Sequence, residues 1–246
     1  MGRSIDYKAR RAEADAARKK PVTLTPLTPE QPPLPLIQYR PRHRRQEMVQ
    51  ELWAESTVMV LTGPAGTGKT AAAFAGGFLD ITSGRARKVL VAKPVVGVDE
   101  DLGFFPGGLD EKLLPWMGSV EDVWGKMAGV PLAAIASVLE LRSVGLCRGR
   151  TVSGATLVVD EAQNLTIKQL VTLCTRPDST GRIVLCGDPD QCDLPADRMV
   201  NGVCPLSHVV QKLTRKRVGR FSVVKFLPED QQRSPFVREF LAAMGM

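Results

Sequence analysis

The chain has 246 residues, of which 43% are hydrophobic and 24% are charged, an ordinary composition for a soluble globular domain with a sizeable core. No uninterrupted apolar stretch approaches the roughly 18 residues of a membrane-spanning helix, and the first residues lack the apolar centre of a signal peptide. From these features we do not expect a membrane protein, and we predict a cytoplasmic location without membrane contact.

The excess positive charge lies in the first 45 residues. This segment carries 11 Lys or Arg and 4 Asp or Glu, a balance of +7 that equals the formal net charge of the whole chain. Seven prolines between residues 21 and 41 exclude a helix there and favour an extended spacer. We predict that residues 1–45 form a flexible basic, Pro-rich arm, which is either simply solvated or gathers nucleic acid through phosphate contacts.

The cysteines indicate a reducing compartment without a structural zinc site. None of the five forms a C-x-x-C pair, and neither of the two histidines stands at metal-ligand spacing from a cysteine. They are Cys147, Cys174, Cys186, Cys192 and Cys204.

The folded domain, 46–246, is predicted to begin with a helix over 46–55 and an apolar strand over 57–62. A glycine-rich turn and a helix over 69–79 follow, which is the order of elements that a P-loop requires. The turn consists of Gly63, Pro64, Ala65, Gly66, Thr67, Gly68, Lys69 and Thr70. In a P-loop, backbone N–H groups surround a polyphosphate, Lys69 would reach its β- and γ-phosphates, and Thr70 would offer its hydroxyl to Mg²⁺. A glycine turn that binds nothing is the alternative.

The middle of the chain is less informative. A second strand is predicted over 88–92, and an acidic, glycine-rich stretch follows over 97–110. Two helices are predicted over 120–127 and 132–141.

A third strand, over 155–159, ends in Asp160 and Glu161. We expect this strand to lie beside the P-loop strand, so that its carboxylates face the same phosphates. Asp160 would then hold Mg²⁺ through water, and Glu161 would orient and deprotonate the water that attacks the γ-phosphate. The alternative is a surface acid pair at the start of a helix.

A helix over 167–174 and a fourth strand over 182–186 precede a Gly-Asp-Pro turn. Gln191, three residues after Asp188, would sense the γ-phosphate or the attacking water; an incidental glutamine in a turn is the alternative. A helix over 205–213, a strand over 221–226 and a helix over 236–244 complete the chain. Five strands alternating with helices predict an α/β fold with a mostly parallel sheet flanked by helices.

Several of these segments occur in the order found in one known family. The segments are Gly63 to Thr70, Lys93-Pro94-Val95, Leu102 to Gly107, Arg148-Gly149-Arg150-Thr151, Asp160 to Asn164, Thr175-Arg176 and Gly187 to Pro195. Together they resemble the PhoH family, ATPases associated with phosphate starvation and also found in phages, whose domain is similar to the first motor domain of superfamily 1 helicases. The resemblance runs from about Gln46 to the C-terminus and implies a RecA/helicase-like P-loop NTPase.

The resemblance also implies roles for two further residues and an assembly. Gln46 matches the glutamine that reads the adenine edge in helicases, and Arg233 matches the arginine of the family's Arg-His-Pro element, which we expect to act as an arginine finger from a neighbouring subunit. Two positions depart from the family pattern, since Ser234 replaces the histidine and Lys93 replaces the usual arginine. A homohexameric ring is implied as well.

We therefore expect an Mg²⁺-dependent ATPase that acts as a ring-shaped, helicase-type motor on single-stranded nucleic acid, with RNA favoured over DNA. Lys69, Glu161, Gln191 and Arg233 would carry the catalysis. The alternative is a nucleotide-gated RNA-binding or assembly protein with a slow or idle ATPase. A small-molecule kinase fits less well, because a kinase must exclude the activated water that the Asp160-Glu161 pair is suited to recruit.

Overall fold

The computed structural model describes residues 39–94, 120, 123, 135, 137–147, 149 and 151–243. Within them, six parallel strands form a single sheet in the order β3-β2-β4-β5-β1-β6. The strands are β1 (Val58–Thr62), β2 (Lys88–Lys93), β3 (Leu139–Ser143), β4 (Ala155–Val159), β5 (Arg182–Gly187) and β6 (Phe221–Lys225).

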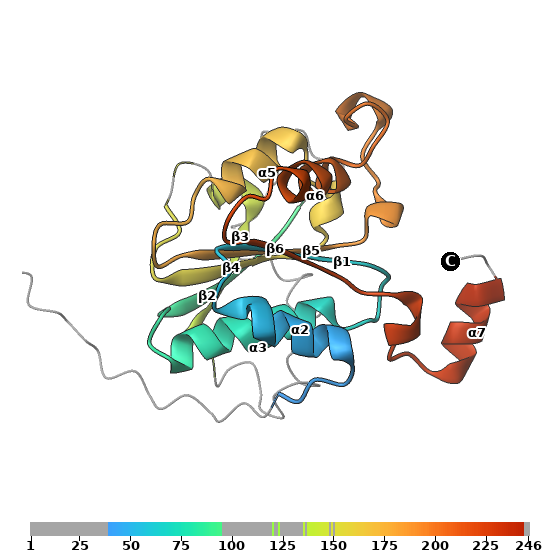
Figure 1. Cartoon of the computed structure of the whole chain (residues 1–246), viewed down its shortest axis with the longest axis horizontal. Helices are drawn as coiled ribbons and strands as arrows, with labels where there is room; N and C mark the ends of the chain where they lie inside the picture. Colours follow the sequence, from blue (N-terminus) through green and yellow to red (C-terminus); the bar gives the residue numbers. More distant parts are fainter. Residues whose placement is uncertain are drawn as a thin grey trace, which may run out of the picture. The chain divides into compact units, whose positions relative to one another are not determined.

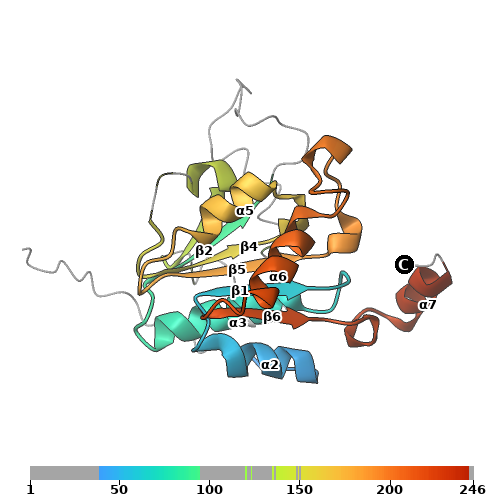
Figure 2. The same cartoon turned by 45° about the horizontal axis from the view of Figure 1, so that its top comes forward.

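Helices cover both faces of this sheet. The α-helices are α2 (Arg44–Trp53), α3 (Lys69–Thr82), α5 (Ile167–Cys174), α6 (Pro205–Arg215) and α7 (Pro235–Ala243). Short 3₁₀ turns connect them, η2 (Val144–Cys147), η3 (Ala162–Asn164), η4 (Pro189–Gln191), η5 (Ala196–Arg198) and η6 (Pro228–Asp230). Figure 1 shows α2 and α3 on one face and α5 and α6 on the other, and Figure 2 shows the same layers from a second direction. No helix in the described part of the chain is long and apolar enough to cross a membrane.

The central strands are mostly apolar and buried because each of their faces packs against a helical layer. Met59 and Leu61 of β1 belong to the core beneath α2 and α3, whereas Val58 and Val60 belong to the core beneath α5 and α6. All five residues of β1 are buried, as are all five of β4. The predicted α/β fold with a mostly parallel sheet flanked by helices is confirmed.

The prediction of five strands was wrong, because a sixth strand, β3, occupies the end of the stretch predicted as a helix over 132–141. Leu139 and Leu141 are partly buried against the core, while Glu140 and Arg142 form an ion pair of 2.7 Å. This alternation suits a strand at the edge of a sheet, where one face is buried and the other is polar. β3 pairs in parallel with β2.

The expected position of the strand that ends at Asp160 was also wrong. β4 does not pair with the P-loop strand β1, because β5 lies between them and pairs with both. Since all three strands are parallel, their carboxyl ends still meet at one edge of the sheet. The acid pair and the P-loop therefore reach the same site across one intervening strand.

Some predicted segments lie outside the described residues. They include residues 1–38 of the arm, the stretch 97–110 and most of the helix predicted over 120–127, of which Val120 and Val123 are described as helical. The division of the chain at residues 45 and 46 stays a prediction. Within the described part, Tyr39, Arg42 and His43 precede α2 and make contacts described below.

Candidate functional site

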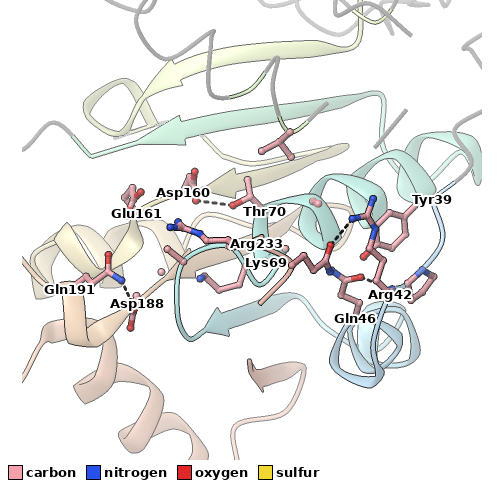
Figure 3. A pocket seen from close by; sticks show the side chains of 18 of the residues that line it. Tyr39, Arg42, Gln46, Lys69, Thr70, Asp160, Glu161, Asp188, Gln191 and Arg233 are labelled. Carbon is pink, nitrogen blue, oxygen red and sulfur yellow. Dashed lines mark hydrogen bonds between the residues drawn. The ribbon is translucent and has the colours of Figure 1, made fainter. Parts of the chain in front are cut away.

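A pocket of about 800 Å³ opens at the carboxyl ends of β1, β4 and β5 (Figure 3). It is lined from six separate stretches of the chain, which the parallel sheet and its crossover connections bring together. The lining residues are Tyr39, Arg40, Pro41, Arg42, Gln46, Ala65, Gly66, Gly68, Lys69, Thr70, Ala71, Val123, Asp160, Glu161, Gly187, Asp188, Gln191, Gln232 and Arg233.

The glycine-rich turn between β1 and α3 has the backbone of a phosphate-binding loop. Gly63 has a φ of 130°, and a β-carbon at this position would lie 2.2 Å from the carbonyl oxygen of Phe226. Only glycine combines this backbone with such close packing. Gly68 directly precedes Lys69, the first residue of α3, so the N-terminus of this 14-residue helix faces the pocket. A helix N-terminus attracts anions through its free N–H groups and its dipole.

The side chain of Lys69 is held by two backbone carbonyl groups of the glycine-rich turn. Its Nζ donates to the carbonyl oxygens of Gly63 at 2.6 Å and Pro64 at 2.7 Å, and the side chain is buried. Burial lowers the pKa of Lys69, whereas the nearby Cys186, Asp188, Asp160 and Glu161 oppose this shift. An ammonium group held in this way can exchange its carbonyl partners for phosphate oxygens without leaving the turn.

Thr70 and Asp160 form the next contact along the pocket, with Thr70 Oγ1 donating to Asp160 Oδ1 at 3.0 Å. Burial raises the pKa of Asp160, and the charge of Glu161 raises it further, while the hydrogen bond from Thr70 opposes both. A hydroxyl and a carboxylate are the hard oxygen donors that Mg²⁺ prefers. The pair therefore fits a magnesium ion, and a bound ion would offset the charge of the neighbouring carboxylates that otherwise repels a triphosphate.

Glu161 follows Asp160 in a left-handed backbone conformation, with a φ of 53°. Non-glycine residues adopt this conformation rarely, and such strain occurs often at functional sites. The carboxylate is oriented by two neighbours, since Oε2 accepts from Gln163 Nε2 at 2.7 Å and Oε1 lies 3.7 Å from Lys93 Nζ. Neither Gln163 nor Lys93 was predicted as a site residue.

Gln163 connects the acid pair to the turn after β5. Its Oε1 accepts from the backbone N–H of Asp188 at 3.1 Å, and its Nε2 also lies 3.4 Å from the carbonyl oxygen of Gln191. Gln191 Nε2 donates to Asp188 Oδ2 at 2.8 Å, so this sequence-predicted residue faces the pocket from a braced turn. Glu161 and Gln163 after β4 are thus coupled to Asp188 and Gln191 after β5. The sequence showed the spacing of residues within each of these two segments, but it did not show the contact between the segments.

Gln46 lies at the other end of the pocket and is only 2% exposed. Both ends of its amide are engaged within the chain, since Oε1 accepts from the N–H of Arg42 at 2.9 Å and Nε2 lies 3.4 Å from the carbonyl oxygen of Thr67. His43 approaches the same carbonyl with its Nε2 at 3.0 Å. Gln46 thus ties the segment before α2 to the glycine-rich turn.

Arg233 lies against the glycine-rich turn of its own chain. A β-carbon at Gly66 would lie 2.5 Å from Arg233 Nε, and the backbone N–H of Gln232 donates to the carbonyl oxygen of Gly66 at 3.0 Å. Figure 3 shows the Arg233 side chain in the pocket with Lys69 and Asp160. The expectation that this arginine acts as a finger in the pocket of a neighbouring subunit stays a prediction.

The segment that carries Arg233 is anchored through Asp230. Asp230 is 5% exposed, and its Oδ1 lies 3.2 Å from both Arg45 Nη1 and His43 Nδ1. Its Oδ2 accepts from the N–H of Leu227 at 2.8 Å. Together with Gln232 Oε1, which accepts from Arg42 Nη1 at 3.0 Å, these contacts fix the segment to the first turn of α2 and the residues before it.

The sheet, the glycine-rich turn and the acid pair define a P-loop NTPase of the RecA/helicase-like class. The family profile described as "PhoH-like protein" matches residues 38–245, and the chain therefore belongs to the PhoH family. This confirms the family resemblance identified in the sequence.

Relatives and solved structures give the following similarities. Protein PhoH2 of Bacillus subtilis is 38% identical over 186 residues, which cover 70% of this chain and 41% of that protein. Protein PhoH of Escherichia coli K12 is 33% identical over 188 residues, covering 74% of this chain and 51% of that protein. The chain thus spans about half the length of these curated relatives. The large terminase from the thermophilic bacteriophage D6E aligns with a TM-score of 0.48 at 11% identity, covering 83% of this chain and 50% of that one.

Proposed function

We propose that this protein binds and hydrolyses ATP with Mg²⁺ and that hydrolysis is coupled to single-stranded nucleic acid, with RNA favoured. The observation that carries the proposal is the convergence of Lys69, the Thr70 and Asp160 pair, and Glu161 on one pocket of about 800 Å³. These are the groups that binding a triphosphate and activating water require, and they come from stretches about 90 residues apart.

Each group has a proposed role in the reaction. Lys69 and the N–H groups of the turn hold the β- and γ-phosphates, and Thr70 and Asp160 hold Mg²⁺, which supplies charge neutralisation on the phosphates when bound. Glu161 accepts the proton of the attacking water, and its orientation by Gln163 and Lys93 favours this role. Gln191 senses the γ-phosphate, and Arg233 stabilises the charge that develops in the transition state.

The adenine end of the pocket is proposed to lie between Tyr39 and Gln46, which line it on the side of α2. Gln46 would exchange one of its present amide contacts for the edge of the base. A homohexameric ring and a helicase-type motor action are parts of the same proposal, and both rest on the family resemblance.

The central test measures ATP turnover with and without Mg²⁺ and a homopolymeric RNA or DNA. Glu161→Gln is expected to lower turnover by a factor of about 10² to 10⁴ while ATP affinity is retained, because only proton transfer is removed. Glu55→Gln, an exposed acid outside the pocket, is the matched control. Unimpaired turnover of Glu161→Gln would exclude Glu161 as the base, and turnover of the unsubstituted protein that no polynucleotide alters would exclude the coupling.

A second candidate is a nucleotide-gated RNA-binding or assembly protein with an idle ATPase. The low aromatic content of the chain, 5% Phe, Trp or Tyr, favours it, because a protein that tracks along a single strand commonly stacks bases on aromatic side chains. This candidate predicts tight ATP binding, slow turnover and an equal effect of ATP and a non-hydrolysable analogue on RNA affinity. Strand displacement that depends on hydrolysis would rule it out.

A further inference from the structure

A dense cluster of cations lies where α6 ends and β6 begins. We define the basic turn as residues 212–220, which carry five exposed cations and no acid. They are Lys212, Arg215, Lys216, Arg217 and Arg220. Between Asp197 and Glu229 the chain has seven Lys or Arg and no Asp or Glu, although residues 46–246 as a whole carry 22 of each sign. The charge of the domain is balanced overall but not in this segment.

These five cations form no ion pair with a carboxylate of the described residues. Elsewhere in the same part of the chain, cations such as Arg44, Arg45 and Lys88 do have acidic partners within 4 Å. The Nε of Arg220 donates to Thr57 Oγ1 at 2.7 Å, a neutral acceptor that leaves the guanidinium charge uncompensated. The basic turn therefore presents its full charge to solvent.

Helix stability explains only part of this cluster. Lys212 and Arg215 stand in the last turn of α6, where cations interact favourably with the helix dipole. Arg217 and Arg220 lie beyond the helix, with φ values of 48° and 59°. Glycine or asparagine is the usual residue in this left-handed conformation, which is costly for a long side chain. Two arginines at such positions add charge at the expense of backbone strain.

The basic turn lies at the end of the sheet where the strands begin, whereas the pocket lies at the end where the strands finish. The carbonyl oxygen of Arg220 accepts from the N–H groups of Thr57 and Val58 at the start of β1, whereas the glycine-rich turn follows the end of β1. In Figure 2, α6 leads into the start of the β6 arrow. Five residues of extended strand, about 3.3 Å each, separate the two ends of the sheet. A ligand at the basic turn would leave the pocket free for ATP.

We propose that the basic turn binds the phosphodiester backbone of a polynucleotide. Three of its five cations are arginines, whose planar guanidinium groups match phosphate oxygens. Residues 212–220 contain no aromatic side chain that could stack on a base, so binding is expected to be independent of sequence. An acidic protein partner would require an apolar centre, and Val218 is the single exposed large apolar residue of this turn.

This inference deepens the proposed coupling to nucleic acid, and its test therefore measures binding without hydrolysis. The test variant is Lys216→Gln with Arg217→Gly in the full chain. Glycine at position 217 relieves the left-handed strain, so the variant is expected to melt at the same temperature as the unsubstituted protein or higher. The matched control is Lys168→Gln with Lys225→Gln, which removes two exposed cations outside the basic turn, Lys168 on α5 and Lys225 at the carboxyl end of β6.

Fluorescence anisotropy with a labelled oligouridylate of about 20 nucleotides, titrated from about 50 to 200 mM salt, gives the readout. The test variant is expected to lose roughly 10-fold or more in affinity at the lowest salt. The slope of its log affinity against log salt concentration should decrease in magnitude by about 1.4, because two contacts with a single strand are lost. The control pair should match the unsubstituted protein.

Equal affinity and slope for the variant and the unsubstituted protein would overturn the proposal and leave the arm or the pocket rim as the contact. A loss of binding to phosphatidylserine vesicles without any loss for oligouridylate would overturn it in favour of a membrane surface. The separate measurement of ATP turnover keeps the two proposals distinct. An inactive protein that still loses oligouridylate affinity in the variant supports the basic turn while excluding the ATPase.

Discussion

At the scale of single residues, Arg233 and Gly66 form the contact with the most direct consequence for mechanism. The arginine side chain rests where a β-carbon of residue 66 would be, and the neighbouring backbone of Gln232 is hydrogen-bonded to Gly66. The guanidinium therefore reaches the phosphate-binding loop of its own chain. An arginine that served its own pocket would make the site independent of how neighbouring subunits are placed.

This geometry predicts the outcome of mixing two inactive variants, Lys69→Ala and Arg233→Ala. If Arg233 serves its own pocket, no subunit in the mixture has both residues in one site, and ATP turnover stays at the sum of the separate rates. An arginine finger in trans would restore turnover, because an Arg233→Ala subunit with an intact P-loop would receive the arginine of its Lys69→Ala neighbour. Turnover of the mixture, measured over a range of ratios, decides between the two.

At the residue scale, the conformation of a local motif could be predicted from the sequence, whereas contacts between distant motifs could not. The turn from Gly63 to Thr70 is legible because its backbone and its ligand chemistry are encoded by adjacent residues. The roles of Gln163 and Lys93 as neighbours of Glu161 depend instead on which strand ends meet. The spacing of residues along the sequence does not specify which strand ends lie side by side. The rule that parallel strands share one carboxyl end predicts only that these residues lie at the same end of the sheet.

At the scale of elements, a buried ion pair connects α3 to the sheet. Arg182 at the start of β5 is 1% exposed, and its Nε donates to Asp80 Oδ2 of α3 at 2.8 Å. Asp80 also accepts from Thr156 Oγ1 of β4 at 2.7 Å, and the guanidinium stacks 4.7 Å from the ring centroid of Trp53 on α2. One ion pair thus holds two helices and two strands together.

Removing one partner of this pair should destabilise the domain strongly. Asp80→Ala leaves the Arg182 charge buried without a carboxylate, which costs about 3 to 5 kcal/mol in comparable cases. Urea denaturation of Asp80→Ala and of the double variant Asp80→Leu with Arg182→Met measures the effect, and the double variant should recover part of the loss because no charge remains buried. A single variant as stable as the unsubstituted protein would show that the pair adds nothing. Glu51→Ala at an exposed ion pair is the control, with little change expected.

Element-level prediction depended on how unambiguous each hydrophobic pattern was. The fully buried strands β1, β4 and β5 were located within one or two residues, because each is a short apolar run bounded by turn residues. β3 was missed because Leu139 and Leu141 continue an apolar pattern that also suits a helix, and only pairing with β2 resolves it as a strand. Strand order could not be read from the sequence either, since β5 is inserted between β4 and β1 by tertiary packing.

At the scale of the whole molecule, the boundary between the arm and the domain determines how the arm can be tested. Residues 1–45 were predicted as the arm, yet Arg42 donates to Gln46 and Gln232, and His43 lies against Thr67 and Asp230. These contacts connect the residues before α2 to both the glycine-rich turn and the segment that carries Arg233. A deletion that removes them would alter the pocket as well as the arm.

Two deletions therefore separate the functions of this region. Removing residues 1–37 takes away seven Lys or Arg but keeps Tyr39, Arg42 and His43, so ATP affinity should be unchanged while oligouridylate affinity falls at low salt. Removing residues 1–45 should in addition weaken ATP binding, because Gln46 loses its partner Arg42 and Thr67 loses its contact with His43. Isothermal titration with an ATP analogue and anisotropy over a salt series measure the two affinities. Equal ATP affinity in both deletions would show that the contacts before α2 do not support the pocket. Unchanged oligouridylate affinity in the shorter deletion would show that the arm does not contact nucleic acid.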